Sequence, residues 1–284
     1  MTSAPVRRPA RSLRAVLLLT LGVAALAGCQ RREAEPETPA ETPVAGATVT
    51  PADAAAPLNF ESRTPDAEVA LRLPEAVARQ PDLHARLYAA DVRDLRQFAE
   101  GAQADLSEFG GGGMRGYSRT ISWSSGAETG KLLSLGREVT EYTGGAHDSL
   151  AYSAVLWDKA LKRVVDPADL FRPGADLTVL DRNLCEAINL ARKARDASIS
   201  PVSLGASDDF GCPRAGETPF MLAASDRPGK AGGLTFLIAP YTVGPWAEGS
   251  YQVQVPQAAF RELLAPAYVD EFAGAPVKAA GEGR

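Results

Sequence analysis

The sequence predicts an α+β fold in two parts, in which helices pack on an antiparallel β-meander. Alternating polar and apolar residues recur over residues 117–123, 132–142 and 151–157, separated only by short turn-like stretches. Two longer stretches, 81–109 and 176–195, repeat apolar residues at helical spacing. Because the strands follow one another without intervening helices, a parallel β/α sheet is not expected.

The first part begins with an alternating stretch at residues 69–73, which predicts a strand. A helix should begin at Pro81 and end at the run Gly110–Gly113, because four glycines do not continue a helix. Its apolar stripe comprises Leu83, Leu87, Leu95, Phe98, Ala102 and Leu106. His84 falls on the polar side of this helix and is expected to be solvated.

The second part contains the other long helix, whose C-terminal Lys193 and Arg195 suit the negative end of the helix dipole. Its inward face comprises Leu177, Leu180, Leu184, Ile188 and Ala191. Three further strands and a final helix after Pro256 are expected. The strands are predicted at 220–225, 234–238 and 251–255.

These patterns predict an N-terminal strand–helix–strand part over residues 58–135 and a C-terminal α+β part over 136–268. A flexible tail is expected over 269–284. Apolar residues make up 45% of the chain, which is enough for a packed core and excludes wholesale disorder. No apolar run reaches the roughly 20 residues of a membrane span.

The charge is unevenly placed along the chain. Residues 1–28 hold four Arg and no acidic residue, so the remainder holds 26 Lys and Arg against 35 Asp and Glu, a net charge of −9. Because an acidic chain repels phosphate backbones, nucleic acid is not expected as a partner.

Residues 1–28 have the pattern of an export signal. Four arginines precede the apolar stretch Ala15–Ala27, whose 13 residues are too few to span a bilayer. The following Leu26-Ala27-Gly28-Cys29 resembles a bacterial lipobox, in which Cys29 is acylated and anchors the chain to the membrane. The alternative is an ordinary signal peptide with a chance cysteine. Gln30 is not the aspartate that marks inner-membrane retention, so an outer-membrane lipoprotein facing the periplasm is expected.

Residues 29–57 are predicted to form a tether after the lipidated cysteine. From residue 30 they hold five Pro and eight Ala but no Leu, Ile or aromatic residue, and therefore cannot build a core. Cys185 and Cys212 remain as an even pair, which is expected to form a disulfide in an oxidising compartment. Two buried free thiols are the alternative.

Motifs for catalysis and cofactor binding are missing from the sequence. There is no Gly-x-Ser-x-Gly elbow, no dinucleotide-binding glycine motif and no paired-histidine spacing for zinc. The chain is therefore expected to need no cofactor and no metal, and to be no enzyme.

One segment nevertheless combines an aromatic residue, two glycines and an imidazole beside a carboxylate. Its candidate binding residues are Tyr142, Gly144, Gly145, His147 and Asp148. The segment is either a recognition loop or a tight turn in which the histidine braces the next strand. A catalytic His147–Asp148 pair would need a nucleophile or metal that the sequence does not supply.

A second segment, Ala239–Gly249, holds two prolines, two glycines and two aromatic residues. Tyr241 and Trp246 suit the gripping of a protein or a sugar if they are exposed. Otherwise the segment covers the end of the core.

The segments Tyr142–His147, Asp169–Phe171 and Pro240–Gly249 resemble, in order and spacing, a domain-of-unknown-function family. That family forms the extracytoplasmic part of lysozyme-sensing, RsiV-type anti-sigma factors, and a similar module precedes the catalytic domain of PdaC-type peptidoglycan deacetylases. The resemblance covers roughly residues 65–268. It implies an α+β fold, no cofactor and no established catalysis; lysozyme binding is implied only for the anti-sigma branch. This chain is expected to lack that branch's cytoplasmic segment and membrane span, and any deacetylase domain.

The sequence thus predicts a lipid-anchored, monomeric, non-enzymatic protein of the cell envelope. Its expected partner is a lysozyme-like muramidase or peptidoglycan, since lysozymes are commonly basic and complementary charge speeds association. Two alternatives remain open. One is an enzyme acting on peptidoglycan through His147 and Asp148, and the other is a purely structural envelope lipoprotein.

Overall fold

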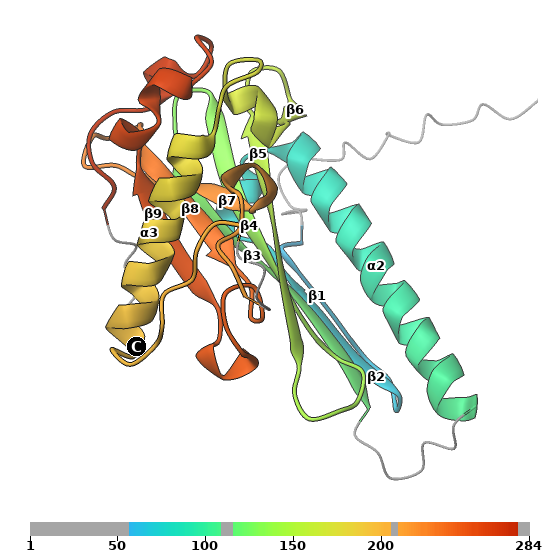
Figure 1. The fold of residues 1–284 in the computed structure, drawn as a ribbon. Helices are drawn as coiled ribbons and strands as arrows, with labels where there is room; N and C mark the ends of the chain where they lie inside the picture. The colour runs from blue at the N-terminus through green and yellow to red at the C-terminus, as the bar shows by residue number, and fades with distance from the viewer. Residues whose placement is uncertain (1–56, 109–115, 206–209, 278–284) are drawn as a thin grey trace, which may run out of the picture. The chain divides into compact units, whose positions relative to one another are not determined.

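The computed structural model describes residues 57–108, 116–205 and 210–277. The signal peptide, Cys29, the tether up to residue 56 and the run Gly110–Gly113 lie outside the described residues. The described elements form two sheets and three α-helices, which confirms the α+β class (Figure 1).

The larger sheet has six strands in the order of the sequence. They are β1 (Asn59–Arg63), β2 (Ala67–Arg72), β3 (Tyr117–Glu128), β4 (Leu132–Tyr142), β5 (Ser149–Asp158) and β6 (Arg163–Val165). All neighbours are antiparallel except β2 and β3, which are parallel because helix α2 connects them. The predicted meander is therefore correct for β3 to β5, whereas the sheet as a whole is mixed.

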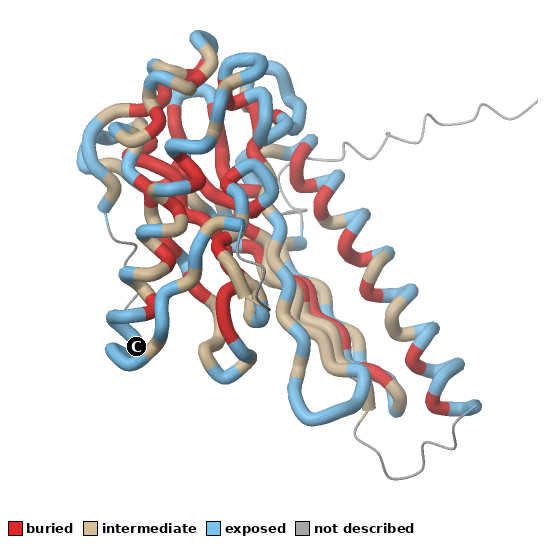
Figure 2. The backbone as a smooth tube through the Cα atoms, viewed as in Figure 1, coloured by how far each residue is buried: buried red, intermediate tan, exposed pale blue. Residues whose placement is uncertain are grey.

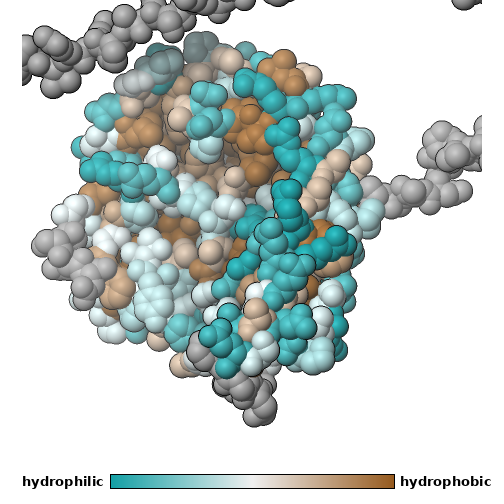
Figure 3. Space-filling view, turned by 90° about the vertical axis from the view of Figure 1, so that its right-hand side faces the viewer, coloured by the Kyte–Doolittle hydropathy of each residue, from teal (hydrophilic) through white to brown (hydrophobic). Residues whose placement is uncertain are grey.

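Helix α2 (Pro81–Glu108) follows the short α1 (Glu75–Ala78) and covers one face of this sheet (Figure 1). Its predicted stripe packs against the inward residues of β2 to β5, and only Phe98 of that stripe is half-buried. Figure 2 shows the buried stripe facing the strands. The outward side is polar, and Figure 3 shows hydrophilic side chains gathered on this face. This amphipathic division explains why the helix forms here.

An ion-pair network adds to the apolar contact between α2 and the sheet. Asp91 is buried and accepts hydrogen bonds from Trp123 Nε1 at 2.7 Å and Arg137 Nε at 3.1 Å. Burial raises the pKa of Asp91, and these hydrogen bonds oppose the shift. Asp94 pairs with Arg119 at 2.6 Å and with Arg137 at 3.2 Å.

The smaller sheet has three antiparallel strands and packs on the other face of the larger one. Its strands are β7 (Phe220–Ala224), β8 (Ala231–Ile238) and β9 (Tyr251–Pro256). Gly126 and Gly136 allow the close approach, since an added Cβ would lie 2.8 Å from Leu222 O and 2.6 Å from Met221 Sδ respectively. Helix α3 (Thr178–Arg195) covers β9 and buries Leu180, Leu184 and Ile188, as predicted.

Five expectations are corrected by the structure. The expected boundary at 135/136 falls inside β4, so the larger sheet runs through it. The stretch before β2 contains an additional strand, β1. After Pro256 the chain forms short 3₁₀ turns, Gln257–Ala259 and Arg261–Leu263, and no α-helix, because Phe260 between them leaves helical geometry.

His84 is the fourth correction. It is buried, and its Nε2 donates to the carbonyl oxygen of Pro57 at 2.8 Å, so it ties down the start of the described chain instead of facing solvent.

The expected flexible tail is packed over residues 269–277. Phe272 is buried and pairs with Ala231, and Pro276 pairs with Ser225. Glu271 accepts hydrogen bonds from Thr129 Oγ1 at 2.5 Å and from the amide of Lys131 at 2.9 Å. This segment therefore packs on the core through Phe272 and Glu271; residues 278–284 lie outside the described part.

Candidate functional site

Two loops that are far apart in sequence bring three rings together. His147 lies in the turn between β4 and β5, and Tyr241 and Trp246 lie between β8 and β9. The imidazole of His147 stacks on the indole of Trp246 with ring centroids 4.2 Å apart and an interplanar angle of 9°. The ring of Tyr241 lies 6.2 Å from His147 and 6.0 Å from Trp246. We call these three residues the aromatic cluster.

The cluster is accessible and its imidazole is oriented. Tyr241 is 55% exposed, His147 is exposed and Trp246 is half-buried. Nδ1 of His147 lies 3.0 Å from the carbonyl oxygen of Asp148, which only accepts, so the proton is assigned to Nδ1. Nε2 then accepts from the hydroxyl of Tyr241 at 3.4 Å.

Tyr241 also has an unusual backbone. Its φ of 67° lies in the left-handed region, where a side chain costs about 1–2 kcal/mol. Such a conformation persists only where surrounding contacts hold it, and it is found preferentially at functional positions.

Arginines on α3 hold the loop that carries Tyr241 and Trp246. Arg192 donates through Nε and Nη2 to the two carboxylate oxygens of Glu248, both at 2.9 Å; the Arg192 side chain is buried, and that of Glu248 is 13% exposed. Arg195 donates to the backbone oxygens of Glu248 and Ser250, the latter at 2.9 Å. This bidentate pairing fixes the distal end of the loop to a helix of the core.

Glu248 is the centre of this clamp. It also accepts from the hydroxyl of Tyr251 at 3.1 Å. Its hydrogen bonds from Arg192 hold the pKa of the carboxyl below its usual value. A Cβ added at Gly244 would lie 2.3 Å from the carboxylate, so the glycine of the Gly244-Pro245 pair is required for Glu248 to reach Arg192.

The turn that carries His147 is built differently. Gly144 and Gly145 both have φ of 99°, which residues with a side chain rarely adopt. An added Cβ would meet nothing within 4 Å at either position, so the need for glycine is conformational. His147 has ring contacts with Trp246 and Tyr241 and a hydrogen bond to the Asp148 backbone.

The other two predicted side chains lie outside the cluster. Tyr142 ends β4 opposite Ser118, and Asp148 faces a groove over β2, β3 and β4. The bond between His147 and Asp148 uses the Asp148 backbone oxygen, which is not the carboxylate–imidazole geometry of a catalytic pair.

The predicted disulfide between Cys185 and Cys212 is confirmed, with Cα atoms 5.3 Å apart. It ties α3 to the segment that precedes β7. Asn189 adds two hydrogen bonds to the backbone of Val202, at 2.8 and 2.9 Å, and Arg192 donates to Ser200 O at 2.8 Å. The segment inside the disulfide loop therefore helps to orient the arginine that holds Glu248.

Sequence reasoning missed Arg192, although a signal was present. Leu180, Leu184, Ile188 and Arg192 follow one another at four-residue spacing, so the stripe of buried residues ends in an arginine. A guanidinium at a buried position requires an acidic partner. The partner, Glu248, lies 56 residues further along the chain and could not be chosen from the sequence.

Two residues of the Asp169–Phe171 triplet contribute to the core and not to the aromatic cluster. Leu170 and Phe171 are buried in the core of the smaller sheet, and Phe171 contacts the ring of Phe260 edge-on at 6.4 Å. Among the described residues, no group of His, Cys, Asp and Glu could hold a metal ion. No helix in the described ranges has the length and apolarity that crossing a membrane requires.

No family model and no curated protein matches the chain. Among solved structures, it is similar to a DUF3298 family member from Bacteroides fragilis, with a TM-score of 0.50 and 15% identity over 75% of this chain and 95% of that one. It is also similar to a DUF3298 family protein from Pseudomonas aeruginosa, with a TM-score of 0.45 and 14% identity over 78% of this chain and 94% of that one.

At such identity the likeness concerns the fold and not the activity. The finer resemblance to RsiV-type ectodomains remains a prediction from the three motifs. In fold, the chain is therefore similar to the DUF3298 family member from Bacteroides fragilis.

Proposed function

We propose that this chain is a lipid-anchored protein of the cell envelope that binds a basic, lysozyme-like protein and catalyses no reaction. The observation that carries the proposal is the exposed aromatic cluster, assembled from the two segments in which the sequence placed binding residues. Tyr and Trp are the residue types that most often dominate the energetics of protein interfaces.

The support of the cluster fits this role. Because the Arg192–Glu248 clamp fixes Trp246 before a partner arrives, less conformational freedom is lost on binding. The net charge of −9 beyond residue 28 suits a basic partner and would accelerate encounter at low salt. Acylation of Cys29 and the tether after it would place the domain at the periplasmic face of the outer membrane.

The test is binding of the full chain, purified from membranes in detergent, to immobilised hen lysozyme. Truncating a central aromatic anchor typically costs at least about 2 kcal/mol, so Trp246→Ala should weaken binding about 30-fold. Leu161→Ala is the matched control, since Leu161 is 63% exposed and lies between β5 and β6, away from the cluster in sequence. Absence of lysozyme binding by the unmodified chain at low salt would exclude this partner.

A further inference from the structure

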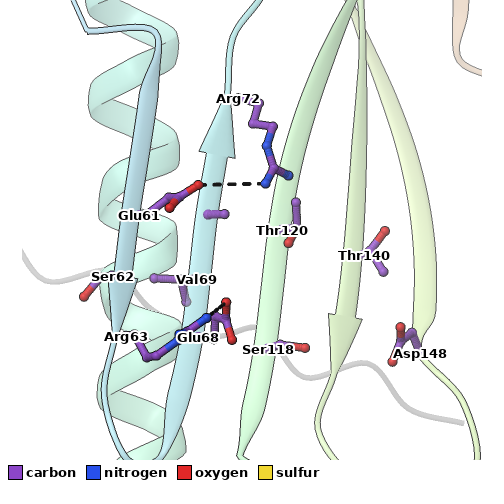
Figure 4. A pocket seen from close by; sticks show the side chains of 11 residues that line it. Glu61, Ser62, Arg63, Glu68, Val69, Arg72, Ser118, Thr120, Thr140 and Asp148 are labelled. Atoms are coloured by element: carbon purple, nitrogen blue, oxygen red, sulfur yellow. Dashed lines mark hydrogen bonds and ion pairs between the residues drawn. The ribbon is translucent and has the colours of Figure 1, made fainter.

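The open face of the larger sheet carries a groove with its own chemistry. Ile121 and Trp123 of β3 point into the core under α2, so Ser118 and Thr120 point to the opposite face. The smaller sheet covers that face only further along β3 and β4, where Gly126 and Gly136 admit Met221 and Leu222. The part nearer Ser118 stays uncovered, and Figure 4 shows the side chains that line it.

Hydroxyl groups form the floor of this groove, which encloses about 580 Å³. Thr120 pairs with Thr140 in the register of β3 and β4, and Ser118 pairs with Glu68 across β2 and β3. Paired residues point to the same face, so the three hydroxyls form one surface across two strands. Each hydroxyl can both donate and accept a hydrogen bond.

The charged residues of the groove are largely paired with one another. Arg63 forms an ion pair with Glu68, and Arg72 lies 3.8 Å from Glu61. With Asp148, the groove has two arginines against three carboxylates, a net charge of −1. This balance disfavours an anionic ligand such as a phosphate, and a metal-binding group is not found among the described residues.

The groove and the aromatic cluster meet at one point of the chain. Asp148 lines the groove, and the next residue back, His147, stacks on Trp246. No ring of the aromatic cluster is among the residues that line the groove. Its hydroxyls and paired ions match an uncharged, hydroxyl-rich ligand.

We propose that this groove is a binding site for a neutral glycan. Its hydroxyls and ion-paired side chains exchange hydrogen bonds with the hydroxyl groups of the sugar, in place of water. The site goes beyond the proposed function, because it is a different surface and takes a different class of ligand.

The probe is chitotetraose, titrated into the full isotope-labelled chain in detergent and followed by NMR. The expected result is saturable shifts at the amides of β2, β3 and β4 around Ser118, Thr120 and Thr140. Thr120→Val with Thr140→Val should weaken binding about tenfold, since each lost hydroxyl removes a hydrogen bond of about 0.5–1.5 kcal/mol. Lysozyme binding should stay unchanged, which separates this site from the aromatic cluster.

A milder pair of variants guards against misfolding. Ser118→Ala removes one groove hydroxyl and should weaken chitotetraose binding by a few-fold. The matched control, Ser153→Ala, lies on β5 opposite Arg137, on the α2 side of the sheet, and should have no effect. If no shifts appear up to about 10 mM sugar, the dissociation constant is too high for specific binding, and the proposal is overturned. Shifts confined to Tyr241 and Trp246 would overturn it equally.

Discussion

The two segments that form the aromatic cluster are stabilised in opposite ways. The loop Ala239–Gly249 is held by a buried ion pair and by backbone hydrogen bonds from α3. The turn that carries His147 depends on two glycines with positive φ and on the stack against Trp246. The loop Ala239–Gly249 is therefore fixed to α3, whereas the turn that carries His147 is held mainly by its stacking on Trp246.

This difference shows where the site gets its precision. A bidentate pair between a helix and a loop leaves few alternative geometries, so Trp246 is presented in one orientation. A glycine turn has more conformations available, and the position of His147 is set by the ring on which it stacks. A substitution in the clamp should therefore disturb both segments, whereas one in the turn should disturb only its own side.

The largest effect is expected for Arg192→Met, which leaves the largely buried carboxylate of Glu248 with the Tyr251 hydroxyl but without its guanidinium partner. Breaking one side of a buried pair costs about 3–5 kcal/mol, and this loss should be visible in the free energy of unfolding measured with urea. Arg192→Met with Glu248→Met should recover much of the stability, because the buried charge is gone. If the free energy of unfolding of Arg192→Met lies within about 0.5 kcal/mol of that of the parent chain, the clamp does not contribute to stability.

Removal of the disulfide should come next. Cys185→Ser with Cys212→Ser opens a loop whose ends are 27 residues apart, and the chain-entropy relation gives a loss of roughly 3–4 kcal/mol. Because the loop contains Ser200, which orients Arg192, lysozyme binding should weaken as well. Unchanged binding at a temperature where the variant is still folded would separate the disulfide from the clamp.

A smaller effect is expected in the turn. Gly145→Ala forces a side chain into positive φ and should destabilise the chain by about 1–2 kcal/mol. Gly101→Ala is the control, since Gly101 lies in α2 with nothing within 4 Å of an added Cβ, and should stabilise by about 0.5–1 kcal/mol. Equal effects of the two changes on the melting temperature would contradict the strained turn.

The smallest effect is expected from acidification, which protonates Glu248 and so weakens its ion pair with Arg192. The pKa of Glu248 is lowered in the folded state, so its stabilisation is complete above the unfolded value of about 4.3 and is lost as the pH falls through the folded value. The free energy of unfolding should therefore fall between about pH 5 and pH 2. Glu248→Gln should show a shallower decline, and identical slopes would contradict the assignment.

Much of the fold could be predicted from periodicity, because α2 and α3 bury residues at helical spacing and strands such as β9 alternate buried and less buried residues. The prediction of an α-helix after Pro256 was wrong. Phe260 and Leu264 are buried in the core, and the chain forms short 3₁₀ turns there. The prediction that His84 is solvated was also wrong. Its ring forms a hydrogen bond with the carbonyl oxygen of Pro57, a tertiary contact that helical periodicity does not report. Periodicity reports which face of a single helix or strand is buried. Contacts between elements depend on how those elements pack together, which periodicity does not report.

The candidate site was predictable to the level of its residues but not of its geometry. The unusual composition of the two segments identified His147, Tyr241 and Trp246. That their rings would touch depends on the packing of the smaller sheet on the larger one, which no local pattern reports. For the same reason Tyr142 and Asp148 were grouped with the cluster, although the pleat of β4 and the following turn place them on the groove side.

The most direct test is hydrogen–deuterium exchange of the full chain with and without hen lysozyme. The account predicts that the partner slows exchange in both Tyr142–Asp148 and Ala239–Gly249, and that Trp246→Ala removes the protection of both segments together. Protection elsewhere with these two segments unchanged would contradict a binding site built from the aromatic cluster.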